Sequence, residues 1–393
     1  MTRLFALGAL LPILRVVGDG SALAADIVPV NTREQFVAAL AAAQPGSEIR
    51  LAPGVYQGGI SQARLRGTKE QPIVIAAADA QDPPVIEGGG SGLQLSSPEH
   101  VELRGLVFAG ATGNGLNIDD SSSTETPAYH VVIRNVVVRE VGPEGNCDGI
   151  KLSGVNDFQV VGCQIERWGG GGSGVDMVGC HNGVVEACRF DGPGGEQANG
   201  VQTKGGSSDV VIRHCRFENA GGRGVNAGGS TGLPYFRPRD AGYEARAITV
   251  EDCEFLGGAA AIAFVGVDGA MVRHNTIYRP RRWALRILQE NTDPRFAPCR
   301  NGKFINNVVA FRSDEVRQIV NIGDKTDPQS FEFTGNVWSC LDRPDDTRRL
   351  VQLPVEEQNG VHEAFAVFED AERGDVRIRG RGPEDAGARP MRK

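Results

Sequence analysis

Four short segments of this chain repeat one another at nearly constant spacing. They read "NCDGIKLSG" (146–154), "GSGVDMVG" (172–179), "ANGVQTKGG" (198–206) and "GRGVNAGG" (222–229). Their shared glycines are 25, 26 and 24 residues apart and stand at Gly149, Gly174, Gly200 and Gly224. A period of this length is typical of solenoids, in which each repeat forms one coil and buries its apolar face only against its neighbours.

A second, more apolar segment follows each glycine segment, as in "DVVIRHCRF" (209–217). One column within these segments carries Cys or Asn, and an apolar residue follows two places later. We interpret the column as a ladder of buried side chains spaced about 4.8 Å apart. Its members are Asn135, Cys163, Cys188, Cys215, Cys253, Asn275, Asn307 and Asn336. The sequence therefore predicts an all-β fold, a single-stranded right-handed parallel β-helix of about ten to twelve coils.

The ends of the chain differ from the repeats. Residues 1–25 have Arg3, an apolar run and the small residues Ala22–Ala24, a pattern that predicts a signal peptide and a secreted or periplasmic protein. No later stretch is long and apolar enough for a membrane span. Thr32 is suited to cap a helix over 33–43, which would cover the first coil. We therefore expect a capped β-helix over 26–340 and a partly disordered extension over 341–393.

The eight cysteines do not predict a simple disulfide framework. Stacked ladder cysteines have parallel Cβ vectors and are poor disulfide partners. The four others could form bridges, but their pairing stays open: Cys147, Cys180, Cys299 and Cys340. No spacing typical of a metal site occurs.

Strand alternation predicts which side chains face outward in the central coils. Apolar residues such as Ile150 and Val201 would point inward. The next positions would form one polar strip of candidate substrate-binding or catalytic residues, namely Lys151, Asp176, Gln202, Lys204 and Asn226. The alternative is an ordinary solvated sheet face.

Two long insertions interrupt the repeats, over 230–246 and 289–302. Insertions in repeat proteins map to loops, often on the binding face. The first carries Tyr235, Arg237 and Tyr243, whose rings can stack on sugars and whose guanidinium can bind a carboxylate. A loop that merely covers the side of the solenoid would look the same.

The net charge of −8 argues against a nucleic-acid partner, which normally requires a basic face. A local basic cleft for an acidic polysaccharide is compatible with it. We expect a monomer.

The N-terminal passage resembles a known group of enzymes. A helix followed by "PGSEIRLAPGVYQGG", "GTKEQPIVIAAAD" and "PPVIEGGGSGLQL" is similar to the opening of β-helical polysaccharide lyases of the chondroitinase B and alginate lyase type. The resemblance implies β-elimination of a uronate-containing glycan. It implies a lysine base, which Lys204 matches, and an assisting arginine on the next coil. Val225 takes the family's arginine position here, and Arg223 is the nearest arginine.

The same resemblance implies that cationic groups or calcium neutralise the sugar carboxylate, and no other cofactor is expected. Arg223 or Arg237 would engage that carboxylate. Tyr235 or Tyr243 would give a proton to the leaving oxygen.

Two other functions remain open. Asp148 and Asp176 lie in passages similar to those of polygalacturonase-like hydrolases, which need carboxylates beside the scissile bond. A secreted β-helix that binds glycans at a surface without turnover is the non-enzymatic alternative.

Overall fold

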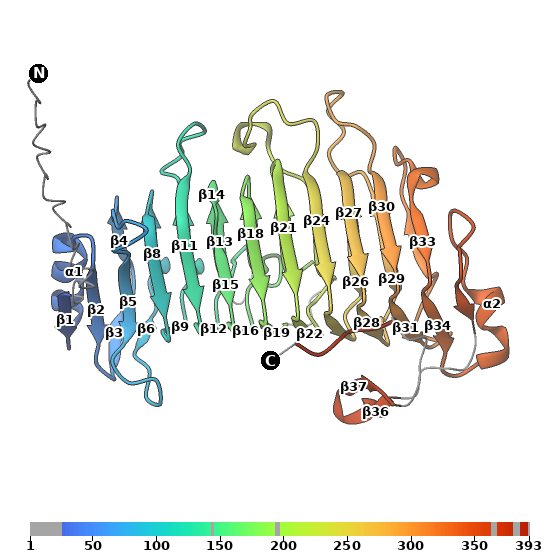
Figure 1. Cartoon of the computed structure of the whole chain (residues 1–393), viewed down its shortest axis with the longest axis horizontal. Helices are drawn as coiled ribbons and strands as arrows, with labels where there is room; N and C mark the ends of the chain where they lie inside the picture. The colour runs from blue at the N-terminus through green and yellow to red at the C-terminus, as the bar shows by residue number, and fades with distance from the viewer. Residues whose placement is uncertain (1–25, 143–144, 193–196, 363–367, 380–385, 392–393) are drawn as a thin grey trace, which may run out of the picture.

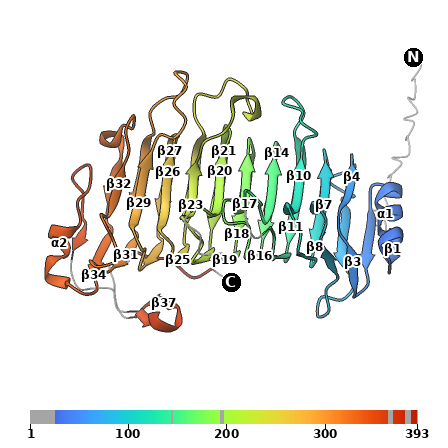
Figure 2. The same ribbon diagram turned by 180° about the vertical axis from the view of Figure 1, so that it is seen from behind.

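The structure is a computed structural model that describes residues 26–142, 145–192, 197–362, 368–379 and 386–391. The predicted signal peptide lies outside the described residues. Parallel strands stack along one axis into three long sheets, which enclose an apolar interior (Figures 1 and 2). The predicted right-handed parallel β-helix is confirmed. No helix in the described ranges is long and apolar enough to cross a bilayer.

Each coil contributes one strand to each sheet in the order sheet 1, sheet 2, sheet 3. Sheet 1 contains β4 (Ile60–Ala63), β7 (Ser91–Ser96), β10 (Asn114–Asp119), β13 (Ile150–Ser153), β17 (Ser173–Val178), β20 (Asn199–Lys204), β23 (Arg223–Gly228), β26 (Ala260–Val265), β29 (Trp283–Leu288) and β32 (Val320–Ile322).

Sheet 2 contains β1 (Asp26–Val30), β2 (Ser47–Leu51), β5 (Ile73–Ala77), β8 (Glu99–Arg104), β11 (Ala128–Arg134), β14 (Val155–Asn156), β15 (Gln159–Val161), β18 (His181–Glu186), β21 (Ser207–Arg213), β24 (Ala245–Glu251), β27 (Val267–Arg273), β30 (Arg300–Ile305) and β33 (Glu332–Thr334).

Sheet 3 contains β3 (Val55–Gln57), β6 (Val85–Glu87), β9 (Val107–Ala109), β12 (Val137–Arg139), β16 (Gln164–Glu166), β19 (Arg189–Asp191), β22 (Arg216–Glu218), β25 (Glu254–Leu256), β28 (Thr276–Tyr278), β31 (Val308–Phe311), β34 (Val337–Cys340) and β35 (Val361–His362).

The ends of the solenoid are covered. At the first coil, α1 (Arg33–Ala42) buries Phe36 and Leu40, and the hydroxyl of Thr32 accepts from Gln35 N at 3.3 Å, as the sequence predicts. At the other end lie η2 (Pro328–Ser330), η3 (Pro344–Asp346) and α2 (Thr347–Leu350). A hairpin of β36 (Phe368–Asp370) and β37 (Asp375–Ile378), joined by η4 (Ala371–Arg373), lies beside sheet 3.

The described parts of the extension contact the coils. Arg389 donates to both carboxylate oxygens of Asp252 at 2.7 and 2.9 Å, and Gly387 N donates to Asn306 O at 2.9 Å. Residues 363–367, 380–385 and 392–393 lie outside the described residues, and the partial disorder expected for 341–393 stays a prediction.

The interior is built from ladders. The rings of Phe190, Phe217 and Phe255 stack with centroids 4.7 Å apart. Asn275 donates to Asn307 at 2.9 Å and Asn307 to Asn336 at 3.0 Å, so the predicted asparagine ladder forms. Cys163, Cys188, Cys215 and Cys253 are buried free thiols that point at backbone carbonyl oxygens.

The other cysteines are not joined in the bridges that the sequence left open. Cys180, Cys299 and Cys340 are buried free thiols, and Cys147 Sγ lies 3.5 Å from the carbonyl oxygen of Thr112.

One member of the predicted ladder was wrong. Val137 pairs with Gln164, so Val136 and not Asn135 stands beside Cys163. Asn135 instead occupies the turn from sheet 2 to sheet 3, where one residue per coil has φ between 51° and 67°. This left-handed turn column comprises Gly105, Asn135, Gly162, Ala187, His214, Asp252, His274, Asn306 and Gly335. His214 and His274 are therefore turn residues.

The repeated glycine has a steric cause. Gly200 has a φ outside the left-handed region, but a Cβ there would lie 2.5 Å from Gly224 O and 2.6 Å from the Phe217 ring. At Gly149, Gly174 and Gly224 a Cβ would likewise meet a backbone oxygen of the next coil and a buried apolar side chain. At these four glycines the backbones of successive coils thus approach each other too closely for a Cβ to fit without movement.

We expect Gly200→Ala to lower the free energy of unfolding by about 1–3 kcal/mol, because the extra methyl overpacks the corner. Gly90→Ala is the matched control, since nothing lies within 4 Å of a Cβ at that exposed position. Denaturant unfolding of both variants measures the difference. Equal stability of the two variants would contradict the steric explanation.

Candidate functional site

The predicted polar strip lies in one row of sheet 1. The strand register places Lys151 beside Asp176, Asp176 beside Gln202 and Gln202 beside Asn226. The intervening apolar residues Ile150, Val175, Val201 and Val225 are fully buried in the interior. Lys204, two residues after Gln202 on β20, points out of the same face. All five residues therefore lie on the face of sheet 1 away from the interior, as alternation predicts, but Asp176, Gln202 and Asn226 are buried there and only the two lysines are partly exposed.

Two lysines and two carboxylates form the centre of this row. Lys151 Nζ donates to Asp176 Oδ2 and lies 3.3 Å from Asp148 Oδ2. Lys204 Nζ lies 3.3 Å from Asp176 Oδ2 and donates to Gln202 Oε1 at 3.2 Å. Asp148 and Asp176 are 2% and 0% exposed, whereas the side chains of Lys151 and Lys204 retain 18% and 15% exposure. The amines thus reach the surface, and the carboxylates lie beneath them.

The electrostatics of this cluster distinguish its members. Burial, reinforced by the charge of Asp176, raises the pKa of Asp148 to about 6. Burial acts to lower the pKa of Lys151, but the charges of Asp176 and Asp148 outweigh it and the net shift is upward. Lys151 is therefore held as a permanent ammonium. Lys204 contacts only one of the two carboxylates.

Several buried polar atoms of this row have no partner within the described part of the chain. They are Asp176 Oδ1 and both polar atoms of the Asn226 side chain. Buried polar atoms are normally satisfied by protein, water or ligand. Asn226 is 0% exposed, so it lies under the surface and not on it.

The two insertions meet above sheet 1. The long loop between β23 and β24 and the loop between β29 and β30 rise side by side at the upper edge of the solenoid in Figure 1. They pack through the rings of Phe236 and Phe296, 5.3 Å apart, and Ala297 N donates to Gly242 O at 3.0 Å. The two insertions therefore pack directly against each other.

The first loop covers a cavity of about 500 Å³, here called the central cavity. It is lined by Asn114, Asn117, Asp119, Asp120, Ser122, Asn146, Lys151, Ser153, Val178, Lys204, Ser230, Thr231, Gly232, Tyr235 and Arg237. Tyr235, in η1 (Leu233–Tyr235), is 65% exposed at its rim. Lys151, Lys204, Tyr235 and Arg237 are thus brought together around one space.

Arg237 anchors the loop. Its guanidinium donates to both carboxylate oxygens of Asp120 and, at 2.9 Å, to Tyr235 O. Its side chain lies against Gly179, where a Cβ would come within 2.7 Å of it. Burial raises the pKa of Asp120 in spite of this pair. Arg237 therefore lines the cavity with its charge already neutralised.

Glu244 holds the base of the loop. This fully buried carboxylate accepts from Gly205 N at 3.0 Å, Thr231 N and Oγ1 at 2.8 Å each, and Asn291 Nδ2 at 3.1 Å. One side chain thus joins the end of β20 to both loops. Neither Glu244 nor Asp120 carried a sequence signal, because each is defined by partners distant in the chain.

Arg223 and Tyr243 are not brought to the central cavity. Arg223 is the first residue of β23, and its register partner is Asn199, the first residue of β20, whereas Lys204 is the last. Arg223 forms an ion pair with Glu290. Tyr243 lies with its ring 4.8 Å from the guanidinium carbon of Arg246. The structure therefore does not bring Arg223 into a pair with Lys204.

The fold defines the class of protein: a right-handed parallel β-helix. Residues 91–233 match the family model "Right handed beta helix region", and residues 30–151 match the model "Chondroitinase B". No curated protein matches this chain.

Solved structures extend the likeness over most of the coils. An alginate lyase from Paenibacillus sp. str. FPU-7 is 19% identical with a TM-score of 0.51, over 75% of this chain and 97% of the lyase. A rhamnogalacturonan lyase is 13% identical with a TM-score of 0.51, over 77% of this chain and 82% of its own. The GH136 lacto-N-biosidase from Eubacterium ramulus is 12% identical with a TM-score of 0.53, over 78% of this chain and 66% of its own. At these identities the likeness establishes the fold.

Proposed function

We propose that this chain binds a uronate-containing polysaccharide in the central cavity and cleaves it by β-elimination. One observation carries the proposal: two lysine amines face a cavity of about 500 Å³, each held on a buried carboxylate. A uronate lyase needs a cation for the sugar carboxylate, a base for the C5 proton and a donor for the leaving oxygen. Lys151, Lys204 and Tyr235 can supply these three groups.

Lys204 is the better base of the two lysines. It contacts one buried carboxylate, Asp176 Oδ2 at 3.3 Å, whereas Lys151 is held between two. Lys151 remains charged between two carboxylates and suits the substrate carboxylate instead.

The reaction then balances without an added reagent. Lys204 Nζ takes the C5 proton, the C4–O bond breaks, and a C4–C5 double bond forms. The Tyr235 hydroxyl protonates the leaving oxygen. Among the described residues, no group of three or more His, Cys, Asp or Glu side chains is arranged to hold a metal ion. The scheme uses Lys151 as the neutralising cation, and we expect activity to survive a chelator.

The test is a turnover assay on alginate, pectate and chondroitin, with two readouts. β-Elimination gives an unsaturated uronate that absorbs in the ultraviolet. New reducing ends without that absorbance would contradict elimination and favour hydrolysis by Asp148 and Asp176. Binding without any product would favour a glycan-binding surface protein.

A hydrolase is the second candidate, since Asp148 and Asp176 contact the same Lys151 ammonium and one similar structure is a lacto-N-biosidase. Both carboxylates are at most 2% exposed beneath the lysines. A sugar in the central cavity would meet the amines first. The geometry thus favours elimination.

Asp148 provides a pH test of the cluster. Its folded pKa of about 6 lies above the value of about 3.9 expected in the unfolded chain. Between these values the folded state holds a proton that the unfolded state has released. The wild type should therefore lose up to about 3 kcal/mol relative to Asp148→Asn as pH rises from about 4 to about 6. Unfolding free energies of both proteins across this range measure it. A pH-independent difference would contradict the raised pKa.

A further inference from the structure

The segment "RPRRWALR", residues 279–286, gathers four arginines in a chain whose net charge is −8. It leads from β28 of sheet 3 into β29 of sheet 1. Elsewhere in the fold most arginines contact a carboxylate, as Arg213 does with Glu186 and Arg300 with Asp268. A local excess of guanidinium groups therefore calls for an anion from outside the chain.

A cleft of about 570 Å³ opens beside this segment. It is lined by Gly221, Ala259, Arg281, Arg282, Asp314, Glu315, Val316 and Arg317. Arginines outside the cleft already contact both of its carboxylates: Arg312 donates to Asp314 at 2.9 and 3.0 Å, and Arg279 to Glu315 at 3.2 Å. The charges of Arg281 and Arg317 thus meet no carboxylate in the described part of the chain.

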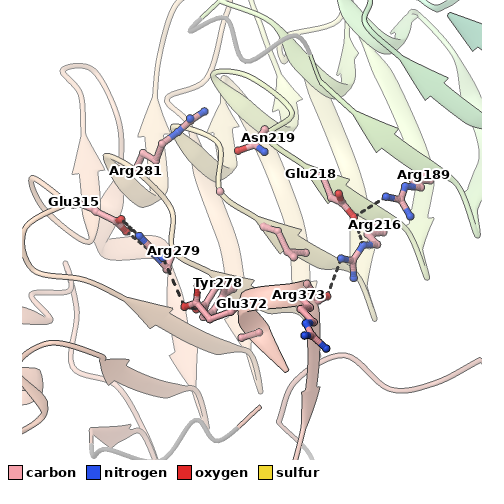
Figure 3. Close-up of a pocket in the computed structure, with 14 residues that line it drawn as sticks. Arg189, Arg216, Glu218, Asn219, Tyr278, Arg279, Arg281, Glu315, Glu372 and Arg373 are labelled. Atoms are coloured by element: carbon pink, nitrogen blue, oxygen red, sulfur yellow. Dashed lines mark hydrogen bonds and ion pairs between the residues drawn. The ribbon is translucent and has the colours of Figure 1, made fainter. Parts of the chain in front are cut away.

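Figure 3 shows the adjoining cleft of about 590 Å³, which shares Arg281 and Glu315 with the first. In that view Glu315 and Arg279 point at each other, and Glu218 is held by Arg189 and Arg216. Arg281 extends away from them with no interaction drawn.

A third guanidinium is pre-positioned on an aromatic ring. The guanidinium carbon of Arg286 lies 4.3 Å from the ring centroid of Trp283, and its Nε donates to Asn321 Oδ1 at 3.0 Å. Stacking fixes the plane of the guanidinium and leaves N–H groups at its edge for a carboxylate or sulfate. Burial, with the nearby charge of Arg223, lowers the pKa of Arg286. Arg223 itself is bound to Glu290. A bound anion would relieve this half-buried excess of positive charge.

The position of Arg286 connects this surface to the central cavity. The register runs from Gln202 through Asn226 and Ala263 to Arg286, so all four share one row of sheet 1, in which Asn226 and Ala263 are fully buried. Three strand steps separate Gln202 from Arg286, about 14 Å along the solenoid axis. A glycan chain that reaches both sites would span this distance over the atoms that cover Asn226 and Ala263.

We propose that Arg281, Arg286 and Arg317, with Trp283 as a platform, form a second binding site for the anionic groups of an extended acidic polysaccharide. The choice of ligand rests on the proposed function, but the site needs no turnover. It holds carboxylate or sulfate groups a few sugars away from the lysine pair.

Equilibrium binding tests the site. The probes are uronate oligosaccharides, dextran sulfate and neutral dextran. All variants are built on Lys204→Met, so that cleavage does not interfere. We expect Arg281→Ala/Arg317→Ala and, separately, Arg286→Gln to weaken binding of the charged probes about tenfold. The control Arg139→Ala/Arg348→Ala removes the same charge from exposed positions elsewhere and should bind normally.

Three results would overturn the proposal: equal weakening by the control pair, equal binding of neutral dextran, or tighter binding of single-stranded RNA than of any glycan. A preference for dextran sulfate or for uronates assigns the anion as sulfate or carboxylate. Failure of the elimination scheme would give a different result. The wild type would then form no product from any polymer, while the arginine variants would still bind the charged probes more weakly.

Discussion

Replacing Lys204 with methionine is expected to reduce turnover of a uronate polymer about 10²- to 10⁴-fold, the usual contribution of a positioned general base. Methionine fills a similar volume but cannot accept a proton. The fold should survive, because Asp176 keeps its contact with Lys151. Initial rates from the ultraviolet absorbance of the product, together with a thermal unfolding curve, measure both effects.

Lys204→Arg distinguishes the role of Lys204 as a base from the effect of its positive charge. Arginine keeps a cation beside Asp176 but does not lose its proton in proteins. The proposed role predicts that this variant is as inactive as Lys204→Met, whereas a purely electrostatic role predicts partial rescue. Lys303→Met is the matched surface control, since Lys303 is 48% exposed and pairs only with Glu332 on sheet 2. Full activity of Lys204→Arg would place the base elsewhere.

The repeat in the sequence was enough to predict the fold, because each coil makes the same contacts as the next. Like residues at the repeat spacing therefore occupy equivalent positions in successive coils. The register of Lys151, Asp176, Gln202 and Asn226 follows directly. The single error in the ladder, at Asn135, arose where asparagine serves a left-handed turn instead of a buried column.

The predicted pairing of Lys204 with Arg223 was wrong because the two residues lie at different heights along their strands. The two residues are close in number, but they stand at opposite ends of neighbouring parallel strands, roughly 16 Å apart along the strand direction. Sequence distance along a coil does not measure distance across the sheet. Only the strand register resolves such a pair.

The contacts of the loops could not be predicted from the sequence, because the loops do not repeat. Arg237 was expected to meet the substrate carboxylate. Its partner in the structure is Asp120, 117 positions earlier in the chain. No periodicity links the two residues. The loop that closes the central cavity is thus determined by single long-range contacts, and Glu244 makes several of them.

Glu244→Ala is expected to lower the free energy of unfolding by about 3–5 kcal/mol, since it leaves several buried donors without an acceptor. These donors are Gly205 N, Thr231 N and Oγ1, and Asn291 Nδ2. Denaturant unfolding measures the loss. Trypsin should also cut the released loop at Arg239 faster than in the wild type.

Turnover should fall in Glu244→Ala as well, because the same loop carries Tyr235 over the central cavity. Glu244→Gln sharpens the test. The amide keeps the size of the side chain but turns one acceptor into a donor that faces other donors, so it should also destabilise the loop. Glu332→Ala, at an exposed glutamate, is the control and should change little. If both Glu244 variants kept wild-type stability and wild-type cutting at Arg239, the loop would be held by its ring contacts and by Arg237 alone. The cavity would then depend on the Arg237–Asp120 pair.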